Sequence, residues 1–210
     1  MIAKIYKKGV EKMRVLFCNI AWMKYYNGIT DDDKPENGGS WVKENNNATE
    51  CLNFAPCNDG TYCGYVSTKS NRGKSNQLHI EKLQGINKDQ DFAEDVLVIW
   101  VAKRNVTAKS TIIGWYKHAT VARYYEWIDG DCPFNVIAKV DDCVLLPLDK
   151  RNKIVPRAGK EGYSYGMGQS NVWFAQNDDE KAKKYVQNMI EYINSYDGEN
   201  LALQNERVYN

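Results

Sequence analysis

The sequence predicts an α+β protein: a curled antiparallel sheet or small β-barrel with flanking helices and a C-terminal helix. Several short runs of β-branched and aromatic residues alternate with polar, glycine-containing stretches, which is typical of strands and loops. One amphipathic run near the C-terminus has helical spacing. The chain has 210 residues, 43% hydrophobic and 26% charged, enough for one domain with a substantial core.

The strongest strands are predicted at residues 14–23, 94–103 and 110–127. "RVLFCNIAWM" (14–23) is rich in β-branched and aromatic residues, as expected for a buried strand. "EDVLVIWVAK" (94–103) is almost continuously apolar and should lie centrally in the sheet. The turn-like residues 104–109 separate it from 110–127, so these two segments are expected to form an antiparallel hairpin.

Weaker strands are expected at "SWVKEN" (40–45) and at "QLHIEKL" (77–83), which alternates. Residues 134–147 form another strand, or two strands with a bend. The insertion at 45–76 is long, polar and cysteine-bearing.

A helix is predicted over 178–198. Its apolar face consists of Ala182, Tyr185, Val186, Met189, Ile190 and Ile193. Acidic residues precede this run and Gly198 can end it. The domain is therefore expected to span 14–198, after an N-terminal extension (1–13) and before a tail or linker (199–210).

Charge and cysteine usage restrict the possible functions. There are 28 Lys and Arg against 27 Asp and Glu, so a nucleic-acid site would have to be a local basic patch. Six cysteines without a CxxC pair, and only two histidines, favour reduced thiols in a cytoplasmic protein over a zinc site. No signal peptide or membrane-length apolar run is present, and no cofactor is expected.

Catalytic motifs are absent: there is no HExxH, no Walker A and no GxGxxG after a strand. His79 and His118 each lie in a predicted strand without a catalytic neighbour in sequence. The carboxylate pair Asp141–Asp142 leaves open a metal-dependent nuclease or hydrolase that would also use a histidine. We otherwise expect this chain to be non-catalytic.

Aromatic residues give the stronger functional signal, with 14 Tyr and 6 Trp against 5 Phe. Trp41, Trp127 and Trp173 each lie next to a glycine-containing or loop-like stretch, where an indole can stack on a flat ligand. Trp100 and Trp115 lie inside strong strands and are expected in the core. Trp22, at the end of the first strand, remains a pocket candidate.

Polar and basic residues near these indoles complete the candidate site. The side chains able to read a base edge are Asn19, Ser40, Gln169, Ser170 and Asn171. The residues expected to contact the nucleic-acid backbone are Lys43, Lys150, Arg151, Lys153, Arg157 and Lys160.

The order of "RVLFCNIAWM", "SWVKEN", "DVLVIWVAK…IIGWYKHATVARYY" and "WIDGDCPFNVIAKVDDCVLLP" resembles the PUA-like superfamily, specifically its EVE and YTH group. The resemblance covers roughly residues 14–175. It implies a PUA-like fold that flips a modified base into an aromatic cage. Trp41 and Trp127 would be the cage walls, Pro133 or Phe134 would close the pocket from a loop, and Asn19 would contact the base.

The resemblance also implies a partner and a context. The ligand would be modified, methylated double-stranded DNA, as in specificity modules of modification-dependent restriction systems of the McrB or HNH-nuclease kind. A nuclease or NTPase domain is then expected to be fused or associated. An RNA-binding PUA-like domain and a protein-interaction module remain the alternatives to DNA recognition. The insertion 45–76 has no counterpart in the group.

Overall fold

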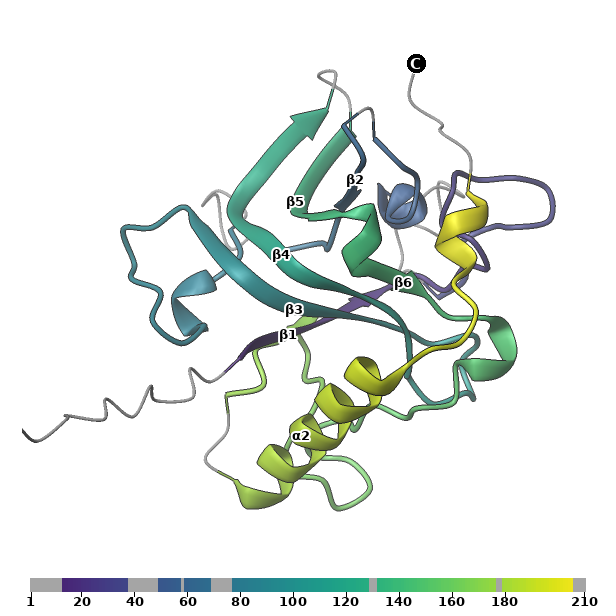
Figure 1. Cartoon of the computed structure of the whole chain (residues 1–210). Helices are drawn as coiled ribbons and strands as arrows, with labels where there is room; N and C mark the ends of the chain where they lie inside the picture. The colour runs from purple at the N-terminus through teal and green to yellow at the C-terminus, as the bar shows by residue number, and fades with distance from the viewer. Residues whose placement is uncertain are drawn as a thin grey trace, which may run out of the picture.

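The computed structural model describes residues 13–37, 49–57, 59–68, 77–128, 132–176 and 179–205. A mixed sheet with strand order β2-β5-β4-β3-β1-β7 forms its centre, and β6 pairs with β4 (Figure 1). Its strands are β1 (Arg14–Ile20), β2 (Thr61–Gly64), β3 (Phe92–Ala102), β4 (Thr111–Ile128), β5 (Cys132–Lys139), β6 (Cys143–Leu145) and β7 (Val172–Trp173). The helical elements are α2 (Glu180–Ser195) and the 3-10 helices η1 (Thr49–Leu52), η2 (Ile80–Lys82), η3 (Val140–Asp142), η4 (Leu148–Lys150) and η5 (Leu201–Gln204).

The strong strand predictions are confirmed as β1, β3 and β4, and β3 and β4 form the expected antiparallel pair. The segment 134–147 is two strands, β5 and β6, because η3 interrupts it. The weak strand at 40–45 lies outside the described residues.

The strand predicted at 77–83 is wrong, because this segment contains the 3-10 helix η2 instead. Leu78 and Ile80 alternate as a strand would require, but the next buried residue is Leu83, three positions further on. A helical turn brings Ile80 and Leu83 into the same core, and the Leu83 N–H donates to the Ile80 carbonyl at 2.8 Å.

The sheet is mixed and open, not an antiparallel barrel. β1 and β3 run parallel, with Arg14 opposite Val96 and Ile20 opposite Ala102. The strand order ends at β2 on one side and β7 on the other, so the ends do not pair with each other. Strands covered on both faces are almost continuously apolar, as β1 and β3 are. An apolar run of this kind does not indicate whether the adjacent strand runs parallel or antiparallel to it.

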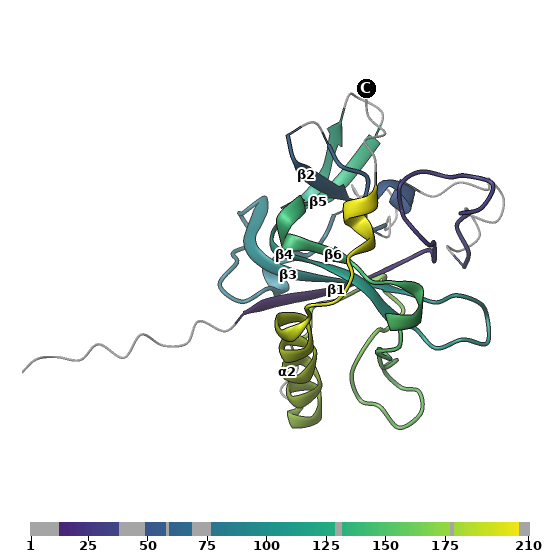
Figure 2. The same cartoon turned by 45° about the vertical axis from the view of Figure 1, so that its right-hand side comes forward.

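The sheet has one apolar cluster on each face. Figures 1 and 2 show α2 on one side, whereas β2, β5 and the far half of β4 curl to the other. The predicted amphipathic helix is confirmed: Ala182 and Ile193 of α2 are buried in the cluster that contains Trp115. The Asp179 side chain accepts a hydrogen bond from the Lys181 N–H and caps the helix.

Residues 199–205, expected to belong to a tail, pack against the sheet. Leu201 and Ala202 of η5 are buried, and the Tyr62 hydroxyl donates to the Ala202 carbonyl at 2.9 Å. These contacts join the C-terminal segment to β2. Within the described part of the chain, no helix has both the length and the apolar character needed to cross a membrane.

Candidate nucleic-acid interface

Trp127 lies near the end of a hairpin arm that extends past the rest of the sheet. β3 begins at Phe92, which lies opposite Ala122 of β4. The part of β4 that follows Ala122 therefore pairs only with β5, and there Trp127 lies opposite Pro133. Figure 1 shows the ends of β4 and β5 projecting away from the α2 side. The Trp127 side chain is 58% exposed. Its indole is therefore available to an external ligand.

Pro133 and Phe134 were expected in a loop that closes over the pocket, but both belong to β5. Phe134 lies opposite Glu126, and Pro133 lies opposite Trp127. Both β5 residues are partly buried. Pro133 is therefore the direct cross-strand neighbour of the indole, whereas Phe134 pairs with Glu126 on the other face of the arm.

The other predicted cage wall, Trp41, lies outside the described residues together with Ser40 and Lys43. A pair of tyrosines, Tyr65 and Tyr125, forms a second aromatic surface, and Tyr125 lies close to Trp127 in the sequence of β4. Tyr125, shortly before Trp127 on β4, stacks on Tyr65 with ring centroids 5.2 Å apart and an interplanar angle of 21°. Sequence reasoning missed this pair, although the aromatic run "YCGYV" interrupts the otherwise polar insertion 45–76.

Hydrogen bonds hold both members of the Tyr65–Tyr125 pair, through the side-chain hydroxyl of Tyr125 and the backbone N–H of Tyr65. The Tyr125 hydroxyl accepts from the Thr68 N–H at 2.9 Å and lies 2.8 Å from the Thr68 hydroxyl. The Tyr65 N–H donates to the Asn53 side chain at 2.9 Å. Burial raises the pKa of Tyr65, and its contact with Tyr125 raises it further. The pair therefore ties the segment after β2 to the arm.

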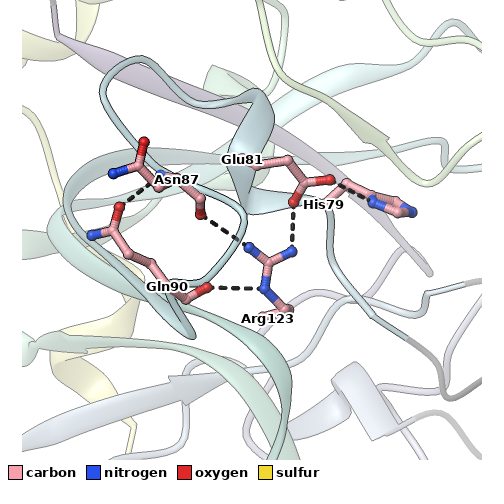
Figure 3. Close-up of polar contacts among 5 residues, drawn as sticks. All are labelled: His79, Glu81, Asn87, Gln90 and Arg123. Atoms are coloured by element: carbon pink, nitrogen blue, oxygen red, sulfur yellow. Dashed lines mark hydrogen bonds and ion pairs between the residues drawn. The ribbon is translucent and has the colours of Figure 1, made fainter.

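Arg123 fixes the base of the arm (Figure 3). Its buried guanidinium donates to the Glu81 carboxylate at 2.5 Å, to the Gln90 carbonyl at 2.9 Å and to the Asn87 carbonyl at 3.3 Å. Its backbone N–H donates to the Asp91 carbonyl at 2.7 Å. Buried charges need such complete partnering, so Arg123 holds the strand that carries Tyr125 and Trp127 against residues 80–91.

Glu81 is the charged partner in this network. Partial burial alone would raise the pKa of its carboxyl, but hydrogen bonds from Arg123 and His79, with the Arg123 charge, outweigh it and lower the pKa to about 2. The His79 Nδ1 lies 2.8 Å from the Glu81 Oε1. The carboxylate is consequently ionised throughout the ordinary pH range.

Two predicted base-reading residues, Asn19 and Asn171, come together at the end of β1. The Asn19 N–H donates to the Asn171 carbonyl at 2.7 Å, and the Asn171 side-chain amide donates to the Ser67 carbonyl at 3.2 Å. Within the described residues, no hydrogen bond engages the Asn19 side-chain amide. Ser170 accepts from the Val172 N–H at 3.3 Å, and Gln169 is exposed.

Trp22 and Arg151 are structural in this fold. The Trp22 indole is buried, with the Arg104 and Arg151 guanidinium carbons 5.2 and 5.8 Å from its ring centroid. Arg151 was expected to contact phosphate, but it is buried and donates to three backbone carbonyls, among them Met23 and Leu146. Its donors hold the chain after β1 in place, which leaves little of the guanidinium for a ligand.

Trp173, another pocket candidate, belongs to the core under α2. Its ring stacks on Phe17 with centroids 4.6 Å apart and lies 6.2 Å from both Tyr165 and Tyr185. The apolar run around Trp173 (172–175) is short and follows a polar, glycine-containing stretch, whereas the rings that pack on Trp173 come from other parts of the chain.

The remaining predicted backbone-contacting residues do not surround Trp127. Lys150 pairs with Asp149, the Lys153 ammonium lies 4.6 Å from the Tyr192 ring centroid of α2, and Arg157 and Lys160 are exposed. Figures 1 and 2 show the segment around residues 150–160, drawn in green, near α2 and on the opposite side of the sheet from the arm. A single continuous surface that joins these cations to Trp127 is therefore not formed by the described residues.

The metal-dependent alternative is not assembled in the described structure either. Both histidines have carboxylate partners other than Asp141 and Asp142: His79 pairs with Glu81, and His118 pairs with Asp95 at 2.7 Å. No group of three or more potential metal ligands occurs among the residues that the structure describes.

No family model, no curated protein and no solved structure matches this chain. The resemblance to the EVE and YTH group thus depends on the sequence segments that carry it. The described structure contributes the exposed indole of Trp127, the tyrosine pair beside it and the charged network that holds their strand.

Proposed function

We propose that this chain is a nucleic-acid-binding domain that recognises a methylated base flipped out of double-stranded DNA. One observation carries the proposal: the 58% exposed indole of Trp127 on an arm that leaves the body of the sheet. An exposed large aromatic at a strand end is well suited to stack on a base. The resemblance to the EVE and YTH group supports a PUA-like fold and a modified ligand.

The energetics define what the site must supply. Extruding a base costs a few kcal/mol, and stacking on an aromatic side chain returns about 1–3 kcal/mol. Burying one methyl group adds only about 0.8 kcal/mol. Recognition therefore needs a second wall in addition to Trp127, and Trp41 is the residue we assign to it.

As a specificity module of a modification-dependent restriction system, the domain would act with a fused or associated nuclease or NTPase. Its own role would be to bind and not to cleave. The separation between Trp127 and the cations at 150–160 leads us to expect a shallow salt dependence, because few phosphates would be neutralised at the base-binding surface.

The test measures fluorescence anisotropy with matched duplexes that differ only in one base: unmodified, methylated adenine, methylated cytosine or hydroxymethylated cytosine. We expect the protein to bind one modified duplex at least several-fold more tightly than the unmodified one. Trp127→Ala should weaken that binding about 5- to 160-fold, in line with the loss of one stacked base.

Tyr124→Ala is the matched control, because Tyr124 is a 43% exposed aromatic on the same strand. It should leave the preference for the modified duplex intact. Both variants should unfold at nearly the wild-type urea concentration, since neither side chain is in the core. Equal affinity for modified and plain DNA would contradict the proposal. Tighter binding of matched RNA would favour the RNA-binding alternative, and no affinity for either would favour a protein-interaction module.

A further inference from the structure

Cys57 and Cys63 lie on one face of the turn that leads into β2. Pro56 forms an antiparallel β-bridge with Tyr62, and the Cys57 N–H donates to the Thr61 carbonyl at 2.8 Å. Side chains alternate between the faces of such a ladder, so the side chains of Cys57, Thr61 and Cys63 share one face and the two cysteines are diagonal neighbours.

The two side chains lie close enough to influence each other. Their mutual interaction is the largest cause of the pKa shift of each thiol. It lowers the pKa of Cys57 and raises that of Cys63. Both cysteines are free thiols; Cys57 is partly exposed and Cys63 is buried. A partly exposed sulfur with a stabilised thiolate, next to a second thiol, is the arrangement found at oxidisable dithiols.

Three other cysteines are in a different chemical situation. Burial raises the pKa of Cys18, Cys51 and Cys143, and that of Cys51 reaches about 12. A buried thiol with a raised pKa is a poor nucleophile toward a peroxide, so these three residues should react slowly with it. Cys63 is also buried with a raised pKa, but it lies beside the partly exposed Cys57, whose pKa is lowered.

We propose that Cys57 and Cys63 form an oxidisable dithiol that closes to an intramolecular disulfide on reaction with a peroxide. The Cys57 thiolate attacks one peroxide oxygen; the O–O bond breaks, and the products are a sulfenic acid on Cys57 and hydroxide, which takes up a proton to become water. The Cys63 sulfur then attacks the Cys57 sulfur. The S–S bond forms, the S–O bond breaks, and the leaving hydroxide takes the Cys63 proton as a second water. Two thiols lose two electrons and the peroxide gains them.

The two cysteines lie at the edge of the sheet. β2 is the terminal strand of the sheet order, so the turn before it can adjust without displacing a second strand. The Asp59 carboxylate accepts from both the Thr61 N–H and the Thr61 hydroxyl, which shapes the turn between the two cysteines.

The full 210-residue chain is treated with hydrogen peroxide, its remaining thiols are alkylated, and it is cleaved before aspartate without reductant. Cleavage before Asp33, Asp59 and Asp89 separates Cys57 (fragment 33–58) from Cys63 (fragment 59–88). We expect these two fragments to remain joined, to be lighter by roughly 2 Da than the sum of the two fragments with Cys51 alkylated and Cys57 and Cys63 as thiols, and to separate on reduction.

Variants identify the sulfur atoms. Cys57→Ser and Cys63→Ser should each abolish the link, whereas Cys51→Ser, which removes the other cysteine of fragment 33–58, should retain it. Before oxidation, Cys57 should be alkylated faster at pH 7 than Cys51, and Cys63→Ala should slow the alkylation of Cys57 several-fold by removing the neighbouring thiol that lowers its pKa. The proposal fails if Cys57 and Cys63 both stay alkylatable after peroxide, if Cys51→Ser removes the link, or if Cys57 is converted to the sulfinic acid without a link.

Discussion

At the scale of single residues, packing decides which side chains are structural. Trp100 and Trp115 were predicted to lie in the core and are fully buried, because each lies within an apolar strand. Trp22 and Trp173 are buried as well, but their partners come from other parts of the chain. Trp127 alone among the described tryptophans is largely exposed. Local sequence context therefore identifies a core tryptophan when it lies well inside a long strand, as Trp100 and Trp115 do, but not when it lies next to a loop.

Gly64 gives the sharpest prediction at this scale. A Cβ at this position would lie 2.5 Å from the Trp100 Cζ2 and 3.2 Å from the Tyr116 Cε2. Both rings are fully buried and cannot move away cheaply. Gly64→Ala should lower the free energy of unfolding by roughly 1–3 kcal/mol in urea denaturation. Gly168→Ala, where no atom lies within 4 Å, is the control and should be close to neutral. An unchanged midpoint for Gly64→Ala would contradict this packing.

At the scale of elements, the structure shows how the arm is supported. The β3–β4 hairpin follows from two apolar runs with a turn between them, and the sequence predicts it. The sequence did not predict η2, because Leu78 and Ile80 imitate the alternation of a strand. Nor did it indicate that Arg123 of β4 binds Glu81, since these residues meet only when η2 packs on β4.

The Arg123–Glu81 pair predicts how stability depends on pH. The pKa of the folded Glu81 is lowered from 4.5 to about 2, so its contribution to stability is complete above about pH 4.5 and is lost as the pH falls toward 2. Glu81→Gln should lower the free energy of unfolding at pH 7 by about 1–3 kcal/mol, because Arg123 loses its charged partner.

Urea denaturation as a function of pH tests this directly. Stability should fall less steeply between pH 4.5 and 2 in Glu81→Gln than in the wild type. Glu180→Gln removes an exposed carboxylate that pairs with Lys183, and should change stability at pH 7 by under about 1 kcal/mol. If the two variants showed the same pH profile, Glu81 would not be the group responsible.

At the scale of the whole molecule, the C-terminal segment closes the fold. The Asn200 side chain accepts from the Leu145 N–H at 2.9 Å and donates to the Cys143 carbonyl at 2.8 Å. It thus pairs with β6, while the adjacent Leu201 and Ala202 enter the core. A segment expected to be a linker is part of the domain.

Asn200→Ala should therefore destabilise the whole domain. It leaves a buried N–H and a carbonyl of β6 without their partners, which costs about 1–3 kcal/mol. Thermal unfolding should still show one transition, at a lower temperature than the wild type. Gln204→Ala, which loses only an exposed bond to Glu199, is the comparison and should keep the wild-type midpoint. Equal midpoints for the two variants would mean that Asn200 does not join this segment to β6.

Local patterns in the sequence were sufficient to determine the helix at 180–195 and the strands β1, β3 and β4, because hydrophobic periodicity reports directly on burial. They placed Trp127 among the indoles expected outside the core, but together with Trp173, which the structure buries. Tertiary structure alone decided the parallel pairing of β1 with β3, the burial of Trp22, Trp173 and Arg151, and the Tyr65–Tyr125 pair. Each of these depends on contacts between residues far apart in the chain, and no local pattern encodes which distant surface a side chain will meet.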